Sequence, residues 1–292
     1  MNVYMAALRR LQRASVWTTY RRLFLIAGAV LACSAQVRAG AWNQDAGHGQ
    51  IIFTSSFLQT ASGFDAAGVS ERFGYNGQFR QLALNPYLEY GLTRRYTLVV
   101  NLNAPFLRYS NQYGASSSAG LGDIEVGIRR RLNSSESAWA VSGQITTQFP
   151  AYSATRNPAP GNHQEDVEAR LLVGRGATWA QHHVFWDAEA AYRYRSGPPA
   201  DQFRADLTGG VNLTRRFMAM GQVFAIKSLR NGDPFNTTNP NAQSDFDLYK
   251  TQLSLVTTLG RGTRVQLGWN DAFAGRNTGG GHTAILGLWK SF

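Results

Sequence analysis

Charged side chains occupy alternate positions in several segments of this 292-residue sequence. Side chains two positions apart on a β-strand point to the same face, so each segment would present its acids and bases together. The set comprises Asp123, Glu125, Arg129 and Arg131, then Glu168 and Arg170, then Asp187, Glu189, Arg193 and Arg195, then Arg204 and Asp206, and last Lys250. Facing acids and bases on neighbouring strands form ion pairs, whereas the same charges around a passage form a selective constriction. The pattern predicts a polar interior with one or both of these roles.

Eight of these residues, on three successive segments, are our candidates for a selectivity site: Glu168, Arg170, Asp187, Glu189, Arg193, Arg195, Arg204 and Asp206. If the segments run antiparallel, the residues that come together at one level are Glu168, Arg170, Arg193, Arg195, Arg204 and Asp206. These six carry four positive and two negative charges, a formal excess of +2. In a narrow passage such an excess raises the local concentration of anions, and salt screens the effect. We therefore expect a weak preference for anions.

Segments of about ten residues, with apolar and polar side chains alternating, must position these charges. In residues 96–106, Tyr96, Leu98 and Val100 share one face, and Thr97 and Asn101 share the other. Twelve such strands are predicted, over residues 48–58, 79–91, 96–107, 121–132, 138–149, 165–174, 183–195, 203–213, 217–228, 247–259, 263–272 and 282–292. Alternation alone is also typical of a soluble sandwich.

The lengths of the connections favour a membrane barrel over a sandwich. Short connections at residues 92–95, 133–137, 214–216 and 260–262 alternate with long ones at 59–78, 108–120, 150–164 and 230–246. Short turns at one rim, longer loops at the other and an even strand number are typical of outer-membrane barrels. The predicted fold class is therefore all-β, a transmembrane antiparallel up-and-down β-barrel in the outer membrane of a Gram-negative cell.

The strand ends carry aromatic residues, which predict two girdles at the membrane interfaces. The expected girdle at the short-turn rim comprises Tyr87, Tyr90, Tyr96, Trp139, Trp179, Phe217, Trp289 and Phe292. The girdle at the long-loop rim comprises Phe57, Phe106, Tyr109, Phe149, Tyr152, Tyr194, Phe203 and Tyr249. The terminal Phe292 also resembles the C-terminal signal that the barrel-assembly machinery recognises. The expected surroundings are outer-membrane lipid and lipopolysaccharide.

Residues 1–39 predict a signal peptide, which leaves 40–292 as the barrel domain. Arginines up to Arg22 precede an apolar run of about 13 residues, and the small-residue site Val37-Arg38-Ala39 follows it. The run is shorter than the ~20 residues that a membrane-spanning helix needs. The leader holds six arginines and no acid, so its removal lowers the formal charge from +11 to +5. The remaining cations are scattered among acids, so no nucleic-acid partner is expected.

The residue types do not favour an enzyme. The only cysteine, Cys33, lies in the leader, and no Gly-x-Ser-x-Gly element, metal-spaced histidine pair or phosphate-binding glycine loop occurs. His282 has lipid-facing parity at the loop end of the last strand, where a lipid hydrolase would need a base, but no serine partner follows at a suitable spacing. We expect no catalytic residue, metal or cofactor. A barrel enzyme acting on lipid and a structural or adhesion barrel stay as alternatives to a channel or transporter.

Three stretches resemble the MetA-pathway-of-phenol-degradation family of outer-membrane proteins. They are Ala41-Trp42 with Gly47-His48-Gly49-Gln50, Asn85-Pro86-Tyr87-Leu88-Glu89-Tyr90-Gly91-Leu92-Thr93, and Gly120-Leu121-Gly122-Asp123-Ile124-Glu125-Val126-Gly127. The resemblance implies a transporter-like barrel that passes small molecules, aromatic or hydrophobic compounds among them. It implies no particular functional residue.

Overall fold

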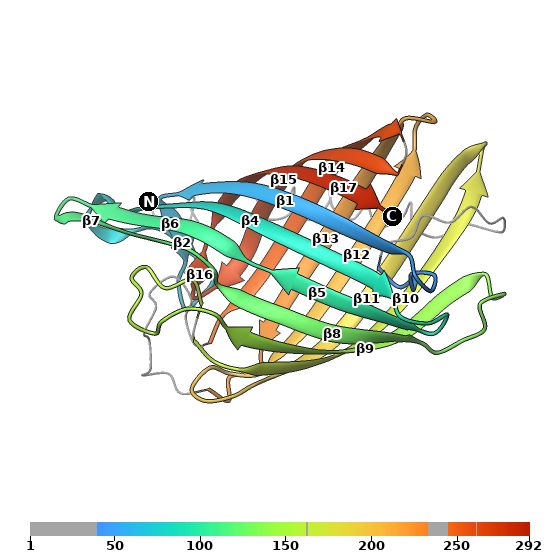
Figure 1. Cartoon of the computed structure of the whole chain (residues 1–292). Coiled ribbons are helices and arrows are strands. Elements are labelled where there is room, and N and C mark those ends of the chain that lie inside the picture. The colour runs from blue at the N-terminus through green and yellow to red at the C-terminus, as the bar shows by residue number, and fades with distance from the viewer. Residues whose placement is uncertain (1–39, 162, 233–244, 261) are drawn as a thin grey trace, which may run out of the picture.

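The computed structural model describes residues 40–161, 163–232, 245–260 and 262–292, and within them the chain forms a closed antiparallel barrel (Figure 1). Twelve strands form the wall of the barrel. β5 and β6 count as one of them, interrupted at Asn103. The strands are β1 (Gly49–Thr60), β4 (Gln78–Gly91), β5 (Tyr96–Leu102) with β6 (Ala104–Asn111), β8 (Asp123–Arg131), β9 (Trp139–Pro150), β10 (Asp166–Trp179), β11 (His182–Arg195), β12 (Gln202–Asn212), β13 (Phe217–Ser228), β14 (Asp247–Gly260), β15 (Thr263–Arg276) and β17 (Gly281–Ser291). Because β1 pairs with both β4 and β17, the wall has no free edge there. The predicted fold class and strand number are confirmed.

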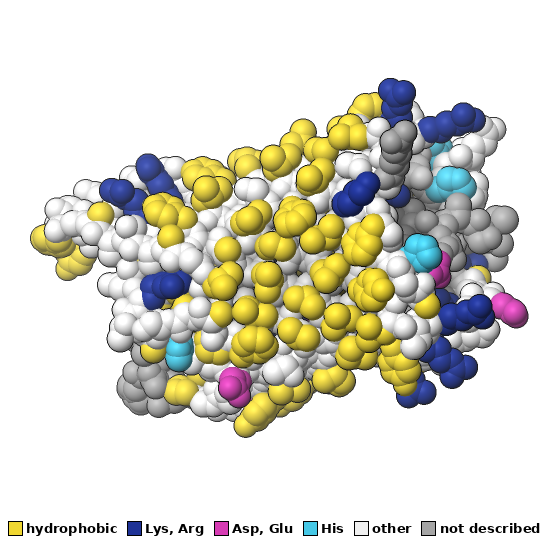
Figure 2. All heavy atoms as spheres, in the orientation of Figure 1, with side chains coloured by type: hydrophobic (Ala, Val, Ile, Leu, Met, Phe, Trp, Pro, Cys, Tyr) yellow, Lys and Arg dark blue, Asp and Glu magenta, His cyan; other side chains and the backbone are white. Residues whose placement is uncertain are grey.

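The alternation of the strands separates an apolar outer surface from a polar interior. Leu82 on β4 is 51 % exposed and its neighbour Ala83 is 1 % exposed. Leu82 lies directly opposite Phe57 on β1 and Phe106 on β6, and both of those rings are also exposed. Hydrophobic side chains cover the middle of the visible face, and Lys and Arg gather toward its two ends (Figure 2). Such a band is the surface that a bilayer would cover. Among the described residues no helix has the length and apolarity to cross a membrane.

Short turns lie at one rim and longer connections at the other, as predicted. The tightest turn joins β10 to β11 through Ala180 and Gln181, whose φ angles are +46° and +70°. Positive φ at both central residues is the conformation that matches the twist of two paired strands. At this rim the first and last strands also meet, since Gly49 and Phe292 exchange backbone hydrogen bonds of 2.9 and 3.0 Å.

The long-loop rim carries structure that the sequence pattern did not reveal. β6 continues beyond the wall and pairs with β7 (Gly114–Ala119), so that a hairpin projects past the barrel (Figure 1). A second, three-stranded sheet joins β2 (Ser62–Phe64), β3 (Ser70–Arg72) and β16 (Thr278–Gly279), and the short 3-10 helix η2 (Gly74–Asn76) follows β3. Strands of two or three residues are too short to show a periodic pattern.

Two aromatic residues assigned to the short-turn girdle face the interior instead. Trp289 is 5 % exposed and donates a hydrogen bond to Gln266 Oε1 (3.1 Å). Tyr87 donates to Glu89 Oε1 inside the barrel (2.6 Å). On both strands the residues at the neighbouring positions point outward, such as Leu288 on β17. The prediction failed because residue type was used where strand parity decides. The predicted signal peptide, residues 1–39, lies outside the described residues.

Candidate functional site

A network of ion pairs lines the lumen on the inward faces of β8 to β12. The inward positions alternate along each strand, and neighbouring strands are in register, so that Glu168 on β10 lies directly opposite Arg193 on β11. Glu168 is only 3 % exposed. Its carboxylate accepts from Arg193 Nε (2.8 Å), Arg170 Nε (2.8 Å) and Arg204 Nη1 (3.1 Å). One buried carboxylate therefore holds three guanidinium groups from three strands.

Arg193 extends the network toward β8 and β9. Its Nη2 lies 2.7 Å from Glu125 Oε1, and its Nη1 donates to Gln148 Oε1 at 2.5 Å. Arg195, two residues further along β11, lies near Asp166, with Nε to Oδ2 at 3.6 Å. The side chains of Arg193 and Arg195 are 9 % and 8 % exposed. This edge of the network lies beside the outer loops.

Arg170 extends the network in the other direction. Its Nη1 lies 2.6 Å from Asp206 Oδ2 on β12 and also contacts Glu189 on β11. Asp187, two residues before Glu189, is buried closer to the short-turn rim. The structure thus joins seven of the eight candidate residues in ion pairs and places Asp187 beside that group.

The network contains more carboxylates than the two, Glu168 and Asp206, that were expected at this level of the lumen. Glu125, Asp166 and Glu189 join the six residues that strand order was expected to bring together. Four arginines then face five carboxylates, a formal charge of −1. The excess of +2 calculated from the six residues alone is offset by these neighbours.

A second buried group lies in the lumen toward the short-turn rim. Arg129 on β8 lies 2.8 Å from Glu89 Oε1 on β4, and it donates to the Tyr87 hydroxyl at 3.1 Å. Arg129 also donates to the carbonyl oxygen of Trp42 (3.1 Å), and Gln44 donates to Glu89 Oε2 (2.7 Å). Residues before the first strand are therefore bound inside the barrel.

This N-terminal segment, residues 40–46, is packed as well as hydrogen-bonded. The carbonyl of Ala41, a fully buried residue, accepts from the Ser142 hydroxyl at 2.7 Å. The Trp42 ring lies edge-on to Phe185 at 6.5 Å and covers Gly174, where a Cβ atom would lie 2.8 Å from the ring. Gly40 has a φ of +72°, and a Cβ there would meet the Asp187 carboxylate at 2.6 Å. Glycine at these two positions lets the segment approach the wall.

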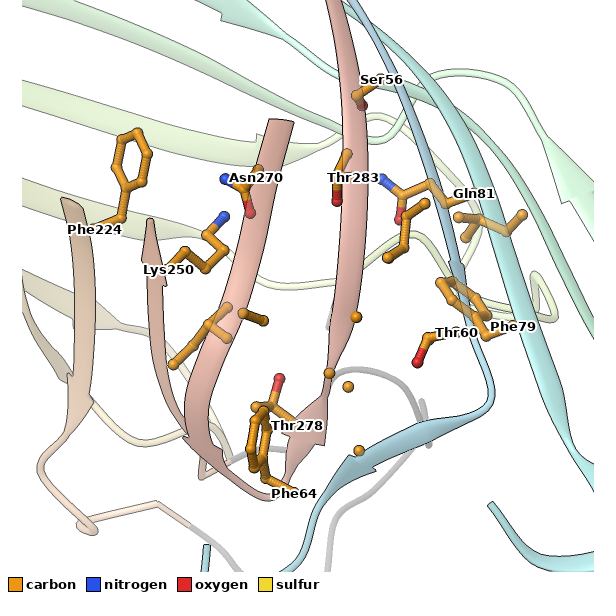
Figure 3. Close-up of a pocket in the computed structure, with 18 of the residues that line it drawn as sticks. Ser56, Thr60, Phe64, Phe79, Gln81, Phe224, Lys250, Asn270, Thr278 and Thr283 are labelled. Carbon is orange, nitrogen blue, oxygen red and sulfur yellow. The ribbon is translucent and has the colours of Figure 1, made fainter. Parts of the chain in front are cut away.

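Two adjoining cavities remain in the lumen. The inner one, of about 570 Å³, is lined by the ion-pair network and reaches Gly40 of the N-terminal segment. The outer one, of about 1070 Å³, extends to the small sheet at the long-loop rim (Figure 3). Both are lined by Thr54, Tyr87, Asn101, Phe224, Gln252 and Ile285. The outer cavity mixes hydroxyl and amide groups with apolar side chains and contains one lysine, Lys250.

The histidine considered as a catalytic base, His282, pairs with an acid at the loop end of the last strand. His282 Nδ1 lies 3.0 Å from Asp271 Oδ1, and its ring stacks on Trp269. No serine, threonine or cysteine of the described residues forms a hydrogen bond with the His282 ring. No group of three or more His, Cys, Asp or Glu side chains within those residues has the arrangement of a metal site.

The sequence pattern missed three residues of the second group. Tyr87 was placed in the girdle, Glu89 was left out of the inward set, and Gln44 precedes the first strand. Parity along β4 provided the signal for Glu89, because it alternates with Leu88 and Tyr90. No periodic signal marks Gln44, which lies in irregular backbone.

These features define an outer-membrane β-barrel with a partly filled lumen, and solved structures share its fold. The COG4313 outer membrane channel from Pseudomonas putida F1 is 15 % identical and has a TM-score of 0.62, over 88 % of this chain and 100 % of that chain. The NanC porin is 8 % identical with a TM-score of 0.50, over 82 % of this chain and 98 % of that chain. No family model matches the sequence, and no curated protein matches it.

Proposed function

We propose that this protein is an outer-membrane channel for small molecules, aromatic and hydrophobic compounds among them. The observation that carries the proposal is the pair of adjoining cavities inside a closed barrel. Their lining suits solutes with both apolar and polar parts, since small-molecule sites combine apolar walls with a few placed polar groups. A barrel of this size is wider than the filled eight-stranded barrels and narrower than sixteen-stranded porins.

The proposal includes membership in the MetA-pathway-of-phenol-degradation family. Two observations support it: the three stretches of sequence resemblance and the shared fold with the COG4313 channel over its whole length. The first stretch contains Ala41 and Trp42, which fill the short-turn end of the lumen. The second contains Tyr87 and Glu89, which bind Arg129 there. Much of the resemblance thus falls on residues that close one end of the passage.

Single-channel recording on refolded protein in planar bilayers tests this function. We expect discrete conductance steps in potassium chloride, and we expect proteoliposomes to take up small aromatic solutes faster than liposomes without protein. A silent barrel that cleaves phospholipid would support the lipid enzyme instead. A barrel silent in both assays would support the structural or adhesion barrel.

The charged network is the proposed site of ion selectivity. Reversal potentials measured in a gradient of potassium chloride, at low and at high mean salt, report it directly. A selective network gives a potential that falls toward zero at high salt, because screening acts over about 8–10 Å. A potential that does not depend on the network arginines would leave these residues with a structural role alone.

A further inference from the structure

Lys250, on the wall of the outer cavity, differs from the arginines of the network in having no carboxylate partner. Among the described residues no acid lies within salt-bridge distance of its ammonium group. Strand register explains this. Asp206 on β12, Phe224 on β13 and Lys250 on β14 lie directly opposite one another in that order. The Phe224 ring stands between the two charges, with Lys250 Nζ at 5.5 Å from its centroid, and Asp206 is bound by Arg170 instead.

A buried amide close to Lys250 also has no partner. Asn270 on β15 is 6 % exposed and faces the same cavity, and its side chain forms no hydrogen bond with any residue that the structure describes. Its strand neighbour Gln252, by contrast, donates to Gln222 Oε1 (2.9 Å) and Ser254 Oγ (3.2 Å). Figure 3 shows the Lys250 side chain extending toward Asn270, with Gln81 across the cavity from both. The Asn270 amide faces the cavity and has no partner in the described part of the wall, so it can form hydrogen bonds with a solute there.

Part of the cavity fits an apolar body. Its wall includes Phe64, Phe79, Leu107, Leu248 and Ile285, and the volume of about 1070 Å³ holds an aromatic ring with room for water. The other charged side chains that line it, Asp65, Glu71 and Arg72, belong to or adjoin the small sheet at the mouth. One ammonium group matches one negative charge, and an ammonium with an amide N–H supplies donors to both oxygens of a carboxylate.

We propose that Lys250 and Asn270 bind the carboxylate of a small aromatic or apolar monocarboxylic acid in the outer cavity. The proposal rests on the channel function and narrows its solute class. Lys250 holds the charge, Asn270 fixes the orientation of the carboxylate, and the apolar wall contacts the body of the solute. A neutral compound of the same shape gains only the apolar contacts.

Isothermal titration of the purified full barrel in detergent tests the site, with benzoate as the probe and benzyl alcohol as the uncharged comparison. The test variant is Lys250→Met, which keeps the length of the side chain and removes its charge. The matched control is Lys227→Met at the loop end of β13, where the lysine is half-exposed and pairs with Asp247. A second variant, Asn270→Ala, tests the amide.

We expect benzoate to bind the wild type and the Lys227→Met control with equal affinity, and benzyl alcohol to bind both at least about ten-fold more weakly. Lys250→Met should weaken benzoate binding about ten-fold or more, since a hydrogen bond to a charged group is among the stronger ones. Asn270→Ala should weaken it by a smaller factor. Neither variant should change the affinity for benzyl alcohol.

Equal benzoate affinity in the wild type and Lys250→Met would overturn the site, and so would equal affinity for benzoate and benzyl alcohol. Circular dichroism and heat modifiability establish that each variant is folded before it is titrated. Because binding is measured at equilibrium, a barrel that binds benzoate without conducting would contradict the channel and leave the site intact. A conducting barrel that fails to bind benzoate would contradict the site alone.

Discussion

At the scale of single residues, Glu168 and Arg193 organise the charged network. Each is buried, and each contacts partners on two or more neighbouring strands. Removing one partner of a buried ion pair destabilises the fold by about 3–5 kcal/mol, because the remaining charge stays buried without compensation. Arg195 lies farther from its carboxylate, with Nε at 3.6 Å from Asp166 Oδ2. Neighbouring arginines on one strand therefore differ in what their loss would do.

Arg193→Gln should destabilise the barrel more than Arg195→Gln. The first change removes short contacts with Glu168 and Glu125, whereas the second removes a longer contact with Asp166. Thermal unfolding, followed by the loss of heat modifiability, should show the larger drop in Tm for Arg193→Gln. The double variant separates the two roles of these residues. A lower Tm with an unchanged reversal potential means a structural role, and a shift of that potential toward cations means a role in selectivity.

Asp201 fixes the loop between β11 and β12 and should make it sensitive to acid. Burial alone would raise the pKa of Asp201, but hydrogen bonds from the Arg195 backbone N–H (2.8 Å), the Asn231 amide (2.9 Å) and the Tyr192 hydroxyl (2.8 Å) outweigh it and hold the pKa below its usual value. A depressed pKa means that the stabilisation is fully present above the unfolded-state pKa, about 3.9, and is lost as the pH falls through the folded-state value.

Hydrogen exchange of the 196–201 loop should therefore be constant from pH 7 to about pH 5, after correction for the intrinsic rate, and accelerate below about pH 4. Asp201→Asn should exchange faster at neutral pH and lose the acid-dependent step. An acid-dependent step that persists in Asp201→Asn would assign the effect to another carboxylate.

At the scale of elements, the N-terminal segment narrows the passage. It lies in irregular backbone, yet it occupies the short-turn end of the lumen through Trp42, Gln44 and the buried Ala41. It is held by hydrogen bonds to β4, β8 and β9 and by the contact between Trp42 and Phe185. Its removal would leave the inner cavity open at that rim.

Trp42→Ala should raise the single-channel conductance, because it removes a bulky side chain from the short-turn end of the lumen. Trp139→Ala is the matched control: the same residue type lies on the outer surface, 39 % exposed. We expect the control to conduct as the wild type does. Equal conductance in all three proteins would show that the segment leaves the passage unobstructed.

The strands were predictable from sequence, and most contacts inside the barrel were not. Alternation identified every strand of the barrel wall, because each strand has one apolar and one polar face. The bounds of β13 agree with the prediction at both ends. Parity also placed Glu168 and Arg193 on the inward side. A period of two does not give the register across several strands, so the sequence did not reveal that Glu125 pairs with Arg193 or that Phe224 lies between Asp206 and Lys250. Nor does it describe irregular backbone, so the sequence did not reveal that residues before β1 enter the lumen.

At the scale of the whole molecule, we predict the orientation in the membrane from the even strand number and the lengths of the connections. Gly49 and Phe292 meet at the short-turn rim, so both ends of the barrel domain lie on one side. In outer-membrane barrels that side faces the periplasm, and the longer loops face outward. Phe292 as an assembly signal, with its ring 54 % exposed at this rim, stays a prediction.

Cysteine labelling of intact cells tests this orientation. Tyr113, 73 % exposed in the β6–β7 hairpin, represents the long-loop rim, and Arg215, in the exposed β12–β13 turn, represents the other. A membrane-impermeant maleimide should label Tyr113→Cys in intact cells and Arg215→Cys only after the outer membrane is permeabilised. Labelling of Arg215→Cys alone in intact cells would reverse the orientation.

The charged network also has a mechanical consequence. Its contacts link β8 through β12 inside the lumen. In the facing arc from β13 to β1, ion pairs such as Lys227 with Asp247 lie at the loop ends of the strands, and the interior holds amide contacts such as Gln252 to Gln222. Side-chain ion pairs inside the lumen make the β8–β12 arc stiffer than the β13–β1 arc. Any change in the cross-section of the barrel is therefore concentrated in the β13–β1 arc, the more compliant of the two. Lys250, Asn270 and most of the outer cavity wall belong to the compliant arc. A solute wider than the resting bore would therefore be accommodated by bending of β13 to β17, while the arginine cluster opposite keeps its shape.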